Sequence, residues 1–227
     1  MNAPVVTVDG PAGSGKTTLG RRLALALGLA FIDTGLFYRA VTAAVVRAGL
    51  AAGDRDRIIK VARATLIEVN TAPGDTSWEV RVDGVDPGVE IHDPRHAALL
   101  TTVSQLPEVR RHLLAPQRAP ASGGAVAVGR DCGTVVFPRA ALKLYLQASE
   151  DLRSARRAAQ LAGHGSAVDP EVLRSEISGR DRGDAPAMGV APDALIIDTG
   201  TRGVDEMVSL ALRLCAAAGI PVPEGRP

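Results

Sequence analysis

The sequence predicts an α/β fold in which a mostly parallel sheet is flanked by helices. Short apolar segments typical of buried strands alternate along the chain with longer segments that have helical spacing. A Gly-rich turn separates the first strand candidate from the first helix candidate, as in many βα units. The length of 227 residues fits one domain with inserted parts.

The N-terminal part of the chain carries two predicted βα units and one further helix. Gly28 and Gly49 stand where the first two helices would end, and glycine readily adopts the left-handed conformation that closes a helix. We expect strands at 5–8 and 30–32, and helices at 16–27, 36–47 and 55–64.

The pattern changes after residue 64. Residues 66–70 and 78–82 alternate apolar and polar side chains, and the Pro-Gly-Asp turn at 73–75 lies between them. We therefore expect a small antiparallel insert, followed by helices near 94–104 and 107–117 and a loop at 119–124.

The C-terminal half returns to alternating strands and helices. The predicted strands are 125–128, 142–146 and 195–197, and the predicted helices are 150–161, 170–178 and 205–216. Residues 221–227 are expected to form a disordered tail.

One motif carries most of the chemistry that can be derived from residue types alone. The sequence GPAGSGKT at 10–17 matches G-x-x-x-x-G-K-[ST], and it has the required strand before it and helix after it. Backbone N–H groups in such a loop converge on phosphate oxygens, and the helix N-terminus adds partial positive charge. We expect ATP to bind here, with Lys16 on the β- and γ-phosphates and Thr17 on Mg²⁺. The predicted donor-binding residues are Gly10, Pro11, Ala12, Gly13, Ser14, Gly15, Lys16, Thr17 and Thr18.

The loop alone does not name a reaction, because GTPases, transporters, motor ATPases and small kinases share it. The sequence contains no N-K-x-D run, which would read guanine, and no L-S-G-G-Q run. The short chain also argues against a large motor ATPase. A small-molecule kinase is therefore the leading class.

Composition excludes several other classes. The 26 Lys and Arg residues are balanced by 25 Asp and Glu residues, and the chain has only six aromatic residues, so nucleic-acid binding is not expected. No apolar run is long enough to span a membrane, and the first residues do not resemble a secretory signal, so a cytoplasmic protein is expected. Cys132 and Cys215 lack metal-ligand spacing and are predicted to be free thiols in a reducing compartment.

Five segments give the chain a family resemblance. They are VDGPAGSGKTT (8–18), IDTGLFYRA (32–40), LPEVR (106–110), GRDCGTVVFP (129–138) and GRDRGD (179–184). With these segments, which span most of the chain, the sequence resembles the bacterial cytidylate kinases, a family of nucleoside monophosphate kinases. The fourth segment is the most specific, because related adenylate kinases share the loop but lack this run.

The resemblance implies a division of the chain. Residues 1–64, 119–162 and 193–220 would form a P-loop NTPase core. Residues 65–118 would form a β-rich insert and helices that bind the acceptor nucleotide, residues 163–192 a short mobile lid, and residues 221–227 a flexible tail.

The resemblance also implies a reaction and its residues. ATP, with Mg²⁺, would phosphorylate CMP and dCMP in a protein expected to be a monomer that contacts neither nucleic acid nor membrane. Lys16, Arg130 and Arg180 would be catalytic. The acceptor would be held by Thr34, Tyr38, Arg39, Thr101, Arg110, Arg130, Asp131, Arg180 and Asp184.

Cytosine recognition needs a carboxylate or hydroxyl beside a guanidinium. Asp131, Arg110 and Thr101 could supply that set, with Ser104 as the alternative hydroxyl. After Asp184 the sequence departs from the family, because it lacks a further lid arginine. The closing charge would then come from elsewhere, or lid closure would be weaker. Arg182, Arg156 and Arg157 are expected to be able to move into the site as well.

Three alternatives stay open from the sequence. The acceptor could be UMP, AMP or a small metabolite such as shikimate, although shikimate-type kinases are shorter and lack the β-rich insert. The chain could also be a nucleotide-binding regulator without catalysis, although the intact Lys16, Thr17, Arg130 and Asp131 argue against this. Nucleic-acid binding is the least favoured.

Overall fold

The computed structural model describes residues 3–74, 79–162, 174, 177–179, 181–183, 185 and 188–223. Its central feature is a five-stranded sheet with the strand order β2-β5-β1-β6-β7, in which every neighbouring pair is parallel. The strands are β1 (Val5–Asp9), β2 (Ala30–Asp33), β5 (Ala125–Gly129), β6 (Leu142–Gln147) and β7 (Leu195–Asp198). The predicted α/β fold with a parallel sheet is confirmed.

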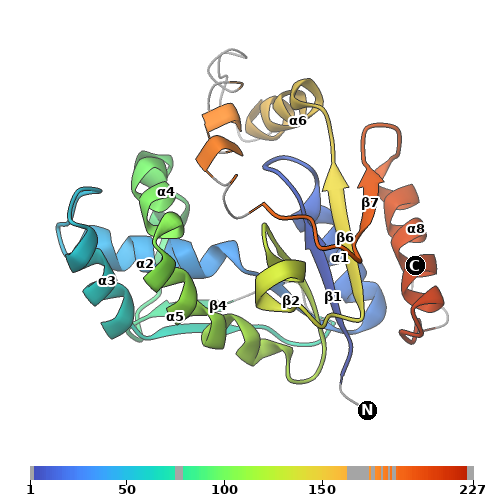
Figure 1. Ribbon diagram of the computed structural model, residues 1–227, viewed down its shortest axis with the longest axis horizontal. Helices are drawn as coiled ribbons and strands as arrows, with labels where there is room; N and C mark the ends of the chain where they lie inside the picture. Colours follow the sequence, from blue (N-terminus) through green and yellow to red (C-terminus); the bar gives the residue numbers. More distant parts are fainter. Residues whose placement is uncertain are drawn as a thin grey trace.

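Helices cover both faces of the sheet (Figure 1). On one face, α1 (Lys16–Leu27) and α8 (Val204–Ala217) pack against alternate side chains of β1, β5 and β6, such as Val6, Val128 and Leu144. On the other face lie α2 (Gly35–Arg47), α3 (Arg55–Ala64) and α5 (Pro107–Arg118). Strands β1, β2, β5 and β6 are buried on both faces, which explains why these four strand candidates are almost entirely apolar.

The predicted antiparallel insert is confirmed. Strands β3 (Ile67–Asn70) and β4 (Glu79–Val82) form a separate two-stranded sheet. Val80 and Val82 of β4 pack with Leu36 and Ala40 of α2, so the apolar face of the hairpin covers this helix. Two 3₁₀ turns follow, η1 (Gly88–His92) and η2 (Pro94–His96), before α4 (Ala97–Gln105).

Two elements differ from the prediction. The helix expected near 94–104 is a 3₁₀ turn followed by α4, which starts at Ala97. After β5 the chain forms a π-helical turn, η4 (Cys132–Val136), where only a family motif had been noted. Asp9 accepts hydrogen bonds from the backbone N–H groups of Cys132 (2.8 Å) and Gly133 (2.7 Å), so a side chain from another strand fixes this turn.

The remaining segments complete the outline. Helix α6 (Glu150–Ala162) follows β6, as predicted. The helix predicted at 170–178 falls partly outside the described residues, but 174 and 177–178 are helical. Cys132 and Cys215 are buried free thiols, as predicted. Within the described ranges, no helix combines the length and the apolar composition that a bilayer crossing would need.

Candidate active site

The strand order brings three chain segments to one edge of the sheet. In the parallel register, Asp9 at the end of β1 lies beside Gly129 of β5, and Asp33 of β2 lies beside Val128. The segments that follow these strands therefore start side by side. Ligands of open α/β sheets bind at this carboxyl edge, and the sequence motifs at 10–17, 33–39 and 129–138 all begin there.

The loop after β1 has a backbone that glycine makes possible. Gly10, Gly13 and Gly15 have φ angles of 146°, 74° and 94°, values that other residues rarely adopt. A Cβ atom on Gly10 would lie 2.3 Å from the carbonyl oxygen of Leu146, so the glycine also permits a close backbone approach to β6. The predicted loop conformation and the start of α1 at Lys16 are confirmed.

Two polar side chains of this loop are buried. The Ser14 hydroxyl has no hydrogen-bond partner within the described structure, and the Lys16 ammonium donates to the Pro11 carbonyl oxygen at 2.7 Å. Residues 12–19 line a cavity of about 810 Å³. A buried, unsatisfied hydroxyl beside a cavity fits a site that is completed by an anionic ligand.

The same cavity is lined by side chains with oxygen atoms that could act as ligands of Mg²⁺. Thr17 is exposed at the start of α1, and Asp33 is the one acidic residue among the described residues that line the cavity. Mg²⁺ prefers oxygen ligands and is usually bound by one or two protein groups together with substrate phosphates. Burial raises the pKa of Asp33, and the N–H group of Gly35 and the charge of Lys16 oppose that shift.

A second polar cluster lies on the acceptor side. The Arg110 guanidinium of α5 forms an ion pair with Asp131, which follows β5, and lies over the Tyr38 ring at 5.6 Å from its centroid. Arg110 also donates to the Ser104 carbonyl oxygen at 3.0 Å. Burial raises the pKa of Asp131, opposed by Arg110, and burial raises the pKa of Tyr38 to about 12. The structure thus brings together three residues predicted from separate segments.

The two candidate hydroxyls on α4 differ in their contacts. Thr101 donates to the Ala97 carbonyl oxygen (3.0 Å), one turn earlier in the helix, and Ser104 donates to the Thr101 carbonyl oxygen (3.0 Å). A Cβ atom on Gly183 would lie 3.0 Å from the Thr101 methyl group, so Thr101 faces the segment after residue 180.

Three of the remaining predicted acceptor residues lie at the same edge. Thr34 is buried, and its hydroxyl donates to the Val128 carbonyl oxygen at 2.9 Å. Arg39 lines the cavity and donates to the Ile91 carbonyl oxygen at 3.3 Å. Arg130 follows β5 directly, and its charge, like that of Arg39, acts on Asp33. Arg180 and Asp184 lie outside the described residues.

Four residues with roles in this geometry were not predicted from the sequence. Asp9 ties β1 to η4, Asp33 is the acid of the cavity, and Gln117 donates from α5 to the Thr34 carbonyl oxygen at 3.3 Å. Arg153 of α6 donates to the Ala12 carbonyl oxygen at 3.0 Å. Asp9 and Asp33 stand at the ends of buried strands, which is a sequence signal, whereas nothing local marks Gln117 or Arg153.

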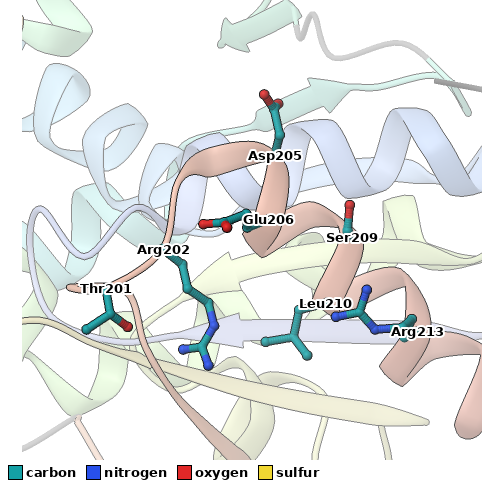
Figure 2. Close-up of a pocket in the computed structure, with 7 residues that line it drawn as sticks. All are labelled: Thr201, Arg202, Asp205, Glu206, Ser209, Leu210 and Arg213. Atoms are coloured by element: carbon teal, nitrogen blue, oxygen red, sulfur yellow. The ribbon is translucent and has the colours of Figure 1, made fainter.

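A second hollow of about 530 Å³ lies along α8 (Figure 2). Its charged groups serve the local structure. Asp205 points away from Arg202 and Arg213 in Figure 2 and pairs with Arg22. Glu206 accepts from the Gly203 N–H at 2.8 Å and so caps α8. The residues that line this hollow include no part of the glycine-rich loop, which lines the larger cavity, so we place the phosphate chemistry in the larger cavity.

Comparisons with known proteins agree with the motifs. The family described as cytidylate kinase matches residues 6–217. A cytidylate kinase of Symbiobacterium thermophilum is 39% identical over 93% of this chain and 95% of its own length. One from Pelotomaculum thermopropionicum is 39% identical over 96% and 98%, and one from Mycobacterium avium is 41% identical over 86% and 87%. With the loop, the acceptor-side cluster and these matches over nearly its whole length, the chain belongs to the cytidylate kinase family.

Proposed function

We propose that this protein transfers the γ-phosphoryl group of ATP to CMP and dCMP and releases the corresponding diphosphates. The observation that carries the proposal is the meeting of two sites at one sheet edge. The phosphate loop at 10–17 lies after β1, and the cluster of Tyr38, Arg110 and Asp131 lies beside the end of the neighbouring strand β5. Family membership supports the same conclusion.

The reaction needs positioning more than it needs a base. The acceptor phosphate is largely a dianion at neutral pH, since its second pKa is about 6. Its oxygen attacks the γ-phosphorus in line, and the bond to the β,γ-bridging oxygen breaks as ADP leaves. The protein must therefore align two polyanions and offset negative charge in the transition state.

On the donor side, the loop residues predicted above would bind the ATP phosphates. Lys16, which is held against the loop by Pro11, would move its ammonium charge onto the β- and γ-phosphates. Thr17 would hold Mg²⁺, with Asp33 as a carboxylate within the same cavity. When bound, the metal supplies positive charge that offsets the charge developing on the phosphate oxygens.

On the acceptor side, Arg39 and Arg130 would hold the phosphate of CMP. Asp131 and Arg110 would read the exocyclic amine and the neighbouring acceptor atoms of cytosine, with Thr101 or Ser104 adding a hydroxyl. A site built on such polar pairing rejects a wrong base strongly, because that base leaves buried polar groups unpaired. Tyr38 and Thr34 would shape this site, and Arg180 and Asp184 would contact the phosphate and the ribose.

These roles imply that different parts of the chain bind ATP and the acceptor. Residues 1–64, 119–162 and 193–220 would form the core that binds ATP, residues 65–118 the part that binds the acceptor, and residues 163–192 a lid. We expect the protein to act as a monomer.

The test is a coupled assay of ADP release with ATP and one monophosphate at a time: CMP, dCMP, UMP or AMP. We expect kcat/KM to be highest for CMP and dCMP. If AMP or UMP turned over better than both, the acceptor assignment would be wrong.

A further inference from the structure

A row of polar contacts joins α6 to the chain segment that follows it. We call these contacts the α6 seam. The later partners stand at positions 174, 178 and 181, intervals of four and three that place side chains on one face of a helix. The seam consists of Arg174 with Asp151 (2.7 Å), Ser178 with Glu150 (2.6 Å) and Asp181 with Arg153 (2.6 Å).

The charged pairs of the seam differ in burial. The side chains of Arg174 and Asp151 are 57% and 76% exposed, whereas those of Arg153 and Asp181 are 7% and 22% exposed. Exposed ion pairs contribute little, because water and salt screen them. A buried guanidinium keeps its charge at all accessible pH values, so it depends on its partners far more.

Arg153 reaches the donor loop as well as Asp181. Its guanidinium donates to the carbonyl oxygens of Ala12 (3.0 Å) and Ala148 (3.2 Å). Its own Cβ lies 3.1 Å from the position that a Cβ on Gly13 would take. One side chain therefore contacts two successive residues of the phosphate loop and the carboxylate at 181.

The residues just after Asp181 contact the acceptor-side helix. Gln105 of α4 donates to the Gly183 carbonyl oxygen at 2.9 Å, and Thr101 approaches the same glycine. Residues 181–183 are helical, so Asp181 and Gly183 belong to one turn. This turn is joined to the donor loop through Arg153 and to the acceptor side through α4.

We propose that Arg153 is a positioning residue that couples the donor loop to the acceptor side through Asp181. One guanidinium nitrogen, Nη1, contacts both the Ala12 carbonyl and the Asp181 carboxylate, and Nε is held by the Ala148 carbonyl, which fixes the turn at 181–183 relative to the loop. The contact places that turn against α4 while the loop holds ATP. This proposal rests on the proposed function, because its kinetic test measures the kinase reaction.

The test is a double-mutant cycle with Arg153→Lys, Asp181→Asn and the double variant. Lysine keeps the charge but loses the Nε bond to Ala148 that orients the guanidinium, and asparagine keeps the shape but loses the charge. We expect each single variant to lower kcat/KM for ATP by about tenfold or more, because small misplacements near reacting groups are costly. The kcat/KM of the double variant should be no lower than that of the less active single variant, because both changes break the same contact.

A second readout separates positioning from simple stability. The readout is the binding ratio, which is the dissociation constant of CMP without a non-hydrolysable ATP analogue divided by the constant with it, both measured by calorimetry. In the wild type the analogue should tighten CMP binding, and in both single variants the binding ratio should fall toward one. The matched control is Arg174→Ala, which removes the exposed pair of the same seam and should leave both the rates and the ratio within about twofold.

Several results would overturn the proposal. One is that the losses of kcat/KM in Arg153→Lys and Asp181→Asn multiply in the double variant. Another is a binding ratio in the single variants that equals that of the wild type. A third is a loss of kcat/KM in Arg174→Ala as large as that in Arg153→Lys. If Arg153→Lys lowers the midpoint of urea unfolding, this variant is destabilised, and the binding ratio of Asp181→Asn is then the test. A wild type that does not turn over CMP would instead refute the proposed function, and the binding ratio would still test the coupling.

Discussion

At the scale of single residues, Asp131 is the most informative side chain of the acceptor cluster. It is buried, follows β5 by two positions, and pairs with an Arg110 side chain that is 25% exposed. Arg110 keeps a second partner in the Ser104 carbonyl oxygen. The partly exposed Arg110 side of this ion pair is accessible, as the proposed role in reading cytosine requires.

We predict that Asp131→Asn reduces the preference for CMP over UMP by about tenfold or more, because leaving a buried polar group without its partner costs about 1–3 kcal/mol. The free energy of unfolding should change less, since Arg110 is partly solvated. Steady-state kinetics with both acceptors and urea unfolding measure the two effects. Asp93→Asn, which breaks an exposed pair with Arg95, is the control. Equal losses of kcat/KM for CMP and UMP would contradict a role in reading the base.

Sequence reasoning placed Asp131 beside Arg110 in one set, but it did not predict the contact of Arg110 with the Tyr38 ring. Tyr38, Arg110 and Asp131 were each named as site candidates, and the structure brings them together. Gln117 and Arg153 were missed because their importance comes from distant backbone carbonyls, those of Thr34 and Ala12. No local pattern encodes a partner 83 or 141 positions away.

At the scale of elements, the packing of α1 on the sheet depends on Gly20. A Cβ atom at this position would lie 2.4 Å from a methyl carbon of Val128 and 3.0 Å from the Phe31 ring. Glycine costs a helix interior about 1 kcal/mol relative to alanine, yet here it permits the close approach of α1 to β5. Val128 is buried and β-branched, so it has little room to move.

We predict that Gly20→Ala lowers the free energy of unfolding by about 1–3 kcal/mol, because overpacking outweighs the gain in helix propensity. Urea unfolding followed by far-ultraviolet circular dichroism measures it. Gly179 is helical, and among the described residues no atom outside its chain neighbours and its own helix backbone lies within 4 Å of the position of a Cβ, so Gly179→Ala should be neutral or stabilising. A stable Gly20→Ala variant would show that α1 can shift away from the sheet.

The predicted elements follow local physics where they agree with the structure. Periodicity located the strands and most of the helices within a few residues, and Gly28 closes α1 with a φ of 64°. The π-helical turn η4 was missed because Asp9, 123 positions away, organises its backbone N–H groups. Tertiary contacts of this kind override local propensity and leave no periodic signal.

At the scale of the whole molecule, function depends on strand order. The order β2-β5-β1 brings residues near 10, 34 and 130 to one edge, although nearly a hundred positions separate the last two. Alternating strands and helices predicted a parallel sheet, but they did not predict which strands would be neighbours. The family resemblance predicted which residues form the site, and the register explains why they meet.

The donor and acceptor groups lie on different elements, so removing the metal should affect them unequally. We predict that excess EDTA abolishes turnover, because Lys16 alone would then face the charge of the triphosphate, and that added Mg²⁺ restores it. CMP at about 100 times its dissociation constant should still raise Tm by roughly 5–10 °C, since the proposed acceptor residues include no metal ligand. Thermal unfolding with and without EDTA, run beside the rate assay, measures both effects. Turnover that persists in EDTA would contradict metal-dependent transfer, and loss of the CMP shift would place the metal in the acceptor site instead.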